Sequence, residues 1–163
     1  MSGQRIAAPL ALLVLLAWGR PTDLRAQGAR PVLVQGQRDL AFGVVFADVA
    51  KTISRLDPAN SGAYQIRGSR NAEVTFTFTL PTALQSAGGQ TMLTEFGADD
   101  AAFSRNPSPA GAVGFDPQRP FVARLDGNGR GYIWLGGTLR PTSGQAPGQY
   151  QGAVVLTVAY TGN

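Results

Sequence analysis

The 163-residue sequence contains no cysteine and no histidine, and Lys51 is its only lysine. A chain without cysteine forms no disulfide bond, so burial of a core must hold this fold together. Histidine is the commonest general base and the commonest metal ligand in proteins, and its absence removes both roles. The composition therefore excludes thiolate chemistry and argues against an enzyme or a metal centre.

Charged residues are also scarce, at 15% of the chain, whereas 44% of the residues are hydrophobic and 21 are glycine and 11 proline. This combination favours a turn-rich β domain over a helical bundle or a disordered chain. The length suits one compact domain. Basic residues lie singly along the sequence, without the Lys/Arg run that marks nucleic-acid binding, so no nucleic-acid partner is predicted.

The N-terminus, residues 1–26, is expected to be a cleaved signal peptide. Arg5 precedes an apolar run at residues 6–18, which is shorter than the roughly 20 residues that a membrane-spanning helix needs. Cleavage is expected after Ala26, with a cut after Gly19 as the second possibility and an uncleaved anchor as the alternative. Removal leaves a single domain, residues 27–163, with eleven basic and nine acidic residues, a net charge of +2 and no membrane span.

Alternation of apolar and polar residues is the main signal in the remaining chain, and it predicts strands. Residues 73–80 present one apolar face before Pro81 ends the strand, and this face comprises Val74, Phe76, Phe78 and Leu80. In residues 150–160 the predicted core face comprises Tyr150, Gly152, Val154, Leu156, Val158 and Tyr160. No segment outside the signal peptide shows a helical period over ten or more residues.

Weaker strands are predicted at residues 39–46, 51–56, 63–68 and 90–96. Residues 120–139 are expected to form a hairpin around the turn Asp-Gly-Asn-Gly. Residues 97–120 hold four prolines without alternation and predict a long surface loop. About seven to eight short strands at this spacing favour an all-β, antiparallel β-sandwich.

A calcium-loop pattern begins at Asp126 and continues with Asn128 at its third position. Its fifth position is Arg130, which repels a cation, and its twelfth is Gly137 where a bidentate glutamate is needed. A turn is therefore the better interpretation, and no metal is predicted.

The sequence also lacks a complete combination of catalytic side chains. Glu73 and Glu95 are the only glutamates, and Asp99 and Asp100 are neighbours in a predicted loop. A serine nucleophile would have Lys51 as its only basic partner. We predict no catalytic residue, no cofactor and no enzymatic activity.

Tyr132 and Trp134 alternate onto one face of a predicted strand. On an outward face they would form a stacking surface for a saccharide, and on an inward face they would belong to the core. Core burial is the commoner outcome for aromatic pairs on strands and is the favoured interpretation.

Three segments, "DLAFG", "LDPANSGAYQIRGSRNAEVTFTFTLP" and "LDGNGRGYIWLGGTLRPTSGQAPGQYQGAVVLTVAY", carry a resemblance to a known family. In order and spacing they resemble exported bacterial proteins with domain of unknown function 4402, over about residues 38–160. The family has no assigned activity, so the resemblance implies a fold more than a function.

The closing segment is also similar to the last strand of fimbrial subunits and of spore-coat-U-like secreted proteins. Those proteins are immunoglobulin-like sandwiches that lack their final strand and receive one from a chaperone or from the next subunit. The likeness implies an immunoglobulin-like sandwich that is secreted, periplasmic or on the surface of a bacterium. It also implies a strand-addition interface formed by Tyr150, Val154, Leu156, Val158 and Tyr160.

We therefore expect a non-enzymatic structural or adhesive protein that is assembled through its last strand. Its expected partners are other subunits, including copies of itself, or a periplasmic chaperone. The early segment at residues 30–34 is the in-chain alternative for closing the same strand edge. The alternative function is a secreted module that binds a glycan through Tyr132, Trp134 and the 97–120 loop.

Overall fold

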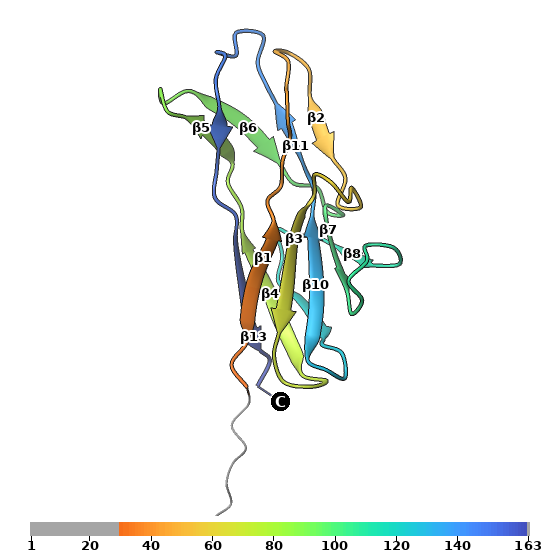
Figure 1. Ribbon diagram of the computed structural model, residues 1–163. Coiled ribbons are helices and arrows are strands. Elements are labelled where there is room, and N and C mark those ends of the chain that lie inside the picture. Colours follow the sequence, from red (N-terminus) through yellow and green to blue (C-terminus); the bar gives the residue numbers. More distant parts are fainter. Residues whose placement is uncertain (1–29, 163) are drawn as a thin grey trace, which may run out of the picture.

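The computed structural model describes residues 30–162 (Figure 1). The expected signal peptide, residues 1–26, lies outside the described residues. The described part forms thirteen strands and no helix. It accordingly contains no helix long and apolar enough to cross a membrane. The strands are β1 (Leu33–Arg38), β2 (Lys51–Ile53), β3 (Gly62–Arg67), β4 (Glu73–Thr79), β5 (Ala83–Ser86), β6 (Thr91–Glu95), β7 (Ala101–Ser104), β8 (Val113–Phe115), β9 (Phe121–Arg124), β10 (Arg130–Leu135), β11 (Gly137–Arg140), β12 (Tyr150–Gln151) and β13 (Val155–Tyr160).

Two antiparallel sheets form a β-sandwich in one half of the molecule. One sheet has the order β1-β3-β10-β7-β8, and the other has the order β13-β4-β9. A third sheet, β12-β5-β6-β11-β2, occupies the other half of the elongated molecule (Figure 1). Because β5 continues β4, β11 continues β10 and β12 leads into β13, the third sheet joins strands from both layers of the sandwich. The expected all-β sandwich is confirmed.

More strands are present than the seven or eight expected, because three long strands are each interrupted once and because β7 and β8 lie in the predicted 97–120 loop. Pro81 separates β4 from β5, since proline has no N–H to continue the ladder. Gly136 separates β10 from β11, where a Cβ atom would lie 2.4 Å from the Ile53 carbonyl oxygen. Each long strand therefore contributes to two sheets.

Aromatic and aliphatic side chains from both layers fill the core of the sandwich. Val74 and Phe76 of β4 are fully buried, as alternation in residues 73–80 predicts. The Phe76 ring lies 5.4 Å from Phe103 of the facing sheet, and the Phe115 and Phe121 rings stack at 4.1 Å. Burial of this cluster is the main source of stability in a chain without disulfides.

Residues 97–120, predicted to be one long loop, instead contain β7 and β8. Strand β7 pairs with β10, and its residues Ala101, Ala102 and Phe103 are all buried. A strand buried on both faces shows no alternation, so its pattern did not distinguish it from a loop.

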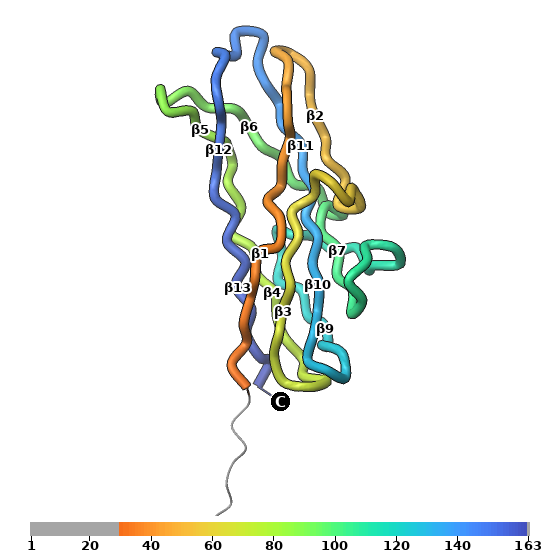
Figure 2. Tube along the Cα trace, viewed as in Figure 1, coloured from red at the N-terminus to blue at the C-terminus, as the bar shows by residue number. Residues whose placement is uncertain are grey.

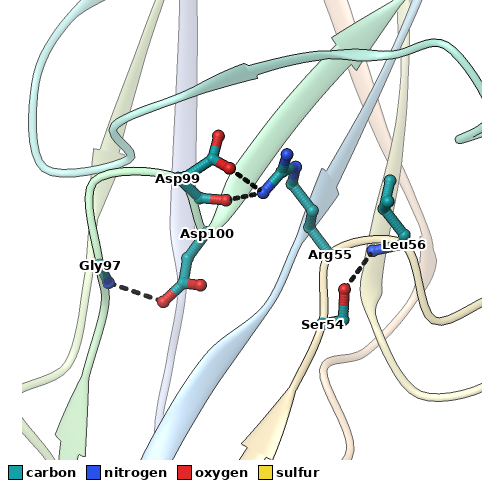
Figure 3. A network of polar contacts seen from close by, with 6 residues as sticks. All are labelled: Ser54, Arg55, Leu56, Gly97, Asp99 and Asp100. Atoms are coloured by element: carbon teal, nitrogen blue, oxygen red, sulfur yellow. Dashed lines mark hydrogen bonds and ion pairs between the residues drawn. The ribbon is translucent and has the colours of Figure 1, made fainter.

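An ion pair holds the loop that leads into β7 (Figure 3). Arg55 Nη1 lies 2.7 Å from Asp99 Oδ2 and also donates to the Asp99 carbonyl oxygen. In the same loop Asp100 Oδ2 accepts a hydrogen bond of 2.6 Å from the Gly97 N–H. A Cβ atom on Gly114 would lie 2.0 Å from Asp99 Oδ1, so glycine permits this close approach.

The strand predicted at residues 39–46 is absent. Gly43 has a φ of 63°, in the left-handed region, and this interrupts the extended backbone. Instead of sharing one buried face, Leu40 and Phe42 are half-buried, whereas Val44 and Phe46 are 73% and 69% exposed.

The hairpin predicted at residues 120–139 is also wrong, although its turn exists. β9 pairs with β4, whereas β10 pairs with β3 and β7. The turn therefore carries the chain from one layer to the other. Asp126 Oδ1 accepts hydrogen bonds from the backbone N–H groups of Asn128 and Arg130, which fixes the turn.

Candidate functional site

Six strands follow the order of an immunoglobulin-like sandwich up to its sixth strand, with β8 added beside β7 and β9 beside β4. In such a sandwich one sheet has the order A-B-E-D, and the other contains C, F and G. In chain order, the letters A to F are assigned to β1, β3, β4, β7, β10 and β13. With these letters the sheet β1-β3-β10-β7 reads A-B-E-D, and the pair β13-β4 places F beside C. β13 thus occupies position F, and its outer edge pairs with no strand within residues 30–162.

Among the described residues β13 is held on one side only, through a six-residue ladder with β4 that runs from Val155 opposite Thr79 to Tyr160 opposite Val74. Its inward side chains pack against the core but stay half-buried, and they are Val154, which lies just before the strand, Leu156, Val158 and Tyr160. Val155 on the opposite face is 52% exposed. The structure thus brings four of the five predicted interface residues to this edge.

Tyr150, the fifth predicted residue, lies in β12 and not in β13. β12 pairs with β5 in the third sheet. The Tyr150 hydroxyl donates a hydrogen bond of 2.7 Å to the Ala146 carbonyl and accepts one from Gln145. This side chain fixes the preceding connector.

β1 is the neighbouring edge strand, and it belongs to the other sheet (Figure 2). Residues 33–38 pair with β3, so the early segment does not form a ladder with β13. Leu33 and Val34 are 60% and 39% exposed. Two unpaired edges, one from each sheet, therefore lie next to each other.

One layer of side chains crosses the sandwich between these two edges. Gly36 of β1 lies opposite Tyr64 of β3, and Leu156 of β13 lies opposite Phe78 of β4. The Tyr64 and Phe78 rings meet edge to face with centroids 6.0 Å apart, yet both stay half-buried. A Cβ atom on Gly36 would meet no described atom within 4 Å, so glycine leaves the β1 side of this layer open.

The partly apolar surroundings of Tyr64 change the pKa of its hydroxyl. Burial raises the pKa of its hydroxyl above the ordinary value, and the Asp39 carboxylate adds a smaller effect in the same direction. A strand that covered this layer would remove more water from Tyr64 and raise that pKa further.

Tyr160 ties the two edges together at the end of the sandwich. Its hydroxyl accepts a hydrogen bond of 2.7 Å from the Ser69 N–H and donates to the Arg30 carbonyl. The Arg30 N–H in turn donates to Ser69 Oγ at 3.0 Å. One hydroxyl therefore connects the end of β13, the β3–β4 turn and the chain entering β1.

Replacing Tyr160 by phenylalanine is expected to lower the free energy of unfolding by about 1–2 kcal/mol, because two backbone groups lose their partner. Urea denaturation measures the change. Tyr132→Phe is the control, since that hydroxyl only accepts a hydrogen bond of 3.2 Å from Gln65, and it should cost clearly less. Equal effects in the two variants would contradict the role given to Tyr160.

Tyr132 and Trp134 lie on the face of β10 opposite the core residues Ile133 and Leu135. Their rings stack at 6.3 Å with an interplanar angle of 24°. Trp134 is only 6% exposed, and Tyr132 is half-buried. Little of the indole ring is therefore open to stack on a sugar.

The family model for domain of unknown function DUF4402 matches residues 32–160. The chain belongs to the DUF4402 family. The match begins one residue before β1 and ends on the last residue of β13, so it covers both edge strands. No curated protein matches the chain. The DUF4402 sandwich thus includes the unpaired β13 edge and the open layer beside it.

Proposed function

We propose that this DUF4402 chain is an exported, non-enzymatic structural or adhesive subunit that assembles by accepting a β-strand along β13. The unpaired β13 edge at position F carries the proposal. In an immunoglobulin-like sandwich, strand G lies beside this edge. A strand added there would satisfy backbone groups of β13 and place alternate side chains toward the interior.

The open layer supports this proposal and gives the strand something to bury. Tyr64, Phe78 and Leu156 offer half-buried apolar surface, and Gly36 leaves room beside them. The donor is another subunit of the assembly, for which a second copy of this chain is the simplest case, and a periplasmic chaperone would hold the edge before assembly.

A Gly36→Val substitution tests the proposal with little risk to the fold. The valine side chain would point inward beside Tyr64, as paired residues share a face, and would fill the space that the added strand needs. We expect assembly of the mature chain, residues 27–163, to weaken at least about tenfold, measured by sedimentation. The matched control is Gln35→Val, which points outward and should assemble normally.

Amide hydrogen exchange on residues 155–160 supplies the second measurement. We expect these amides to gain protection as the mature chain assembles, while β9 at the opposite edge of the sheet does not change. A mature chain that stays monomeric with its β13 amides already fully protected would overturn the proposal. That result would mean that the chain closes the edge itself.

A further inference from the structure

Arginines that are scattered in the sequence gather at one end of the folded molecule. Arg67 lies opposite Arg130 in the β3–β10 ladder, and Arg70 lies in the following turn. Arg124 lies opposite Glu73 at the adjacent end of β4. With Arg30, bound to Ser69, and Arg105, just after β7, these six residues define the basic end: Arg30, Arg67, Arg70, Arg105, Arg124 and Arg130.

All six side chains are exposed, and none forms an ion pair with another described residue. The two acidic groups at this end are engaged elsewhere. Asp126 accepts from the backbone of its own turn, and Glu73 accepts a hydrogen bond of 3.1 Å from Thr161. Arg67 donates a hydrogen bond of 3.1 Å to Gln65 Oε1, and each of the six guanidinium groups keeps further donors that can bind anions.

Charge is distributed unevenly over the described residues as a result. The basic end holds six arginines against two carboxylates, a net charge of +4. The rest of residues 30–162 holds five basic and seven acidic side chains, a net charge of −2. The molecule is thus strongly polarised although the mature chain as a whole carries only +2.

A recess lined by both polar and apolar groups opens beside these arginines, between the β7–β8 hairpin and β9. Its volume is about 370 Å³. Phe103, Phe121 and Val113 contribute apolar walls, and the only charged residues that line it are Arg105 and Arg124. A ligand with both an anionic group and an apolar part suits this arrangement better than a purely polar polyanion does.

The basic end is also the end at which the chain enters β1. Arg30 lies at this end beside the Ser69 turn. Clustered basic residues are attracted to anionic headgroups. The two turns and the chain entry face the same direction, which suits a flat surface (Figure 1).

We propose that the basic end binds an anionic phospholipid surface, with its arginines on the phosphates and an apolar part of a lipid in the recess. This inference does not require strand addition, because it uses one end of the molecule and the recess beside β9, at the opposite edge of the sheet from β13. Binding should fall as salt rises, since exposed charges are screened over about 8–10 Å at ordinary ionic strength.

Vesicle flotation of the mature chain, residues 27–163, tests the proposal. We expect binding to vesicles of phosphatidylcholine with phosphatidylglycerol and none to phosphatidylcholine alone. Replacing Arg67, Arg70 and Arg130 by glutamine should weaken binding about a hundredfold, since each arginine near such a surface contributes about fivefold. The control, with the same change in charge, replaces Lys51, Arg119 and Arg140 and should bind as the unchanged protein does.

Three results would overturn the proposal. The first is an equal loss of vesicle binding in the two triple variants. The second is equal binding to vesicles with and without phosphatidylglycerol. The third is an affinity for heparin or single-stranded DNA that equals the affinity for anionic vesicles at the same salt concentration. The recess has its own test, in which Val113→Asn should weaken vesicle binding and Val122→Asn, an exposed change outside the recess, should not. Gly36→Val should keep full vesicle binding, which separates this inference from the assembly proposal.

Discussion

Replacing Phe76 by alanine is expected to lower the free energy of unfolding by about 3–5 kcal/mol. Phe76 is fully buried at the centre of the sandwich. It contacts Phe103 of the facing sheet and Phe121 of the neighbouring strand, with ring centroids 5.4 and 6.3 Å away. Alanine would leave a cavity between both layers.

This loss is large for the protein because core burial is its main stabilising term. Domains of ordinary size have a free energy of unfolding of about 5–15 kcal/mol, and no disulfide bond stabilises this one. Urea denaturation measures the change, with Thr77→Ala on the exposed face of the same strand as control, expected within about 0.5 kcal/mol. A loss below about 1.5 kcal/mol for Phe76→Ala would contradict the central position given to this ring.

Replacing Gly129 by alanine should cost about 3 kcal/mol, the largest effect expected outside the core. Gly129 has a φ of 76°, and a Cβ atom there would lie 2.1 Å from the Gly68 carbonyl oxygen. Its own carbonyl accepts a hydrogen bond of 2.8 Å from the Gly68 N–H. The substitution therefore strains the residue and separates the two turns at the basic end.

Gly127 provides a matched control within the same turn. It has no positive φ, and a Cβ atom there would meet no described atom within 4 Å. Thermal unfolding of Gly127→Ala should therefore resemble that of the unchanged protein. Similar destabilisation by the two substitutions would show that the turn tolerates no side chain at all, and that contact with Gly68 is not the cause.

The fold class was predictable because several strands bury only one face. Val74 and Phe76 alternate with threonines, and the inward residues of β13 alternate with exposed ones, so both strands were recognised. β7 was missed because burial on both faces removes the alternation. Residues 39–46 alternate as a strand does, but Gly43 takes a backbone conformation that the pattern does not reveal.

The candidate site was predictable only along one strand. Alternation identified the inward face of β13, but Tyr64, Phe78 and Gly36 join it from three other strands whose register depends on tertiary pairing. The Tyr160 hydroxyl bond to Arg30 spans 130 residues, and local patterns carry no information about it. The basic end is hidden for the same reason, since its arginines stand far apart in the sequence.

The direction of β13 has a mechanical consequence. β13 and the strand that leads into it run along the long axis of the molecule (Figure 2). A strand added beside β13 would lie parallel or antiparallel to that axis, so tension along a fibre would load the new ladder in shear. All its hydrogen bonds would then resist together, whereas peeling breaks them one pair at a time. We therefore expect such a fibre to withstand pulling along its length far better than force applied across it.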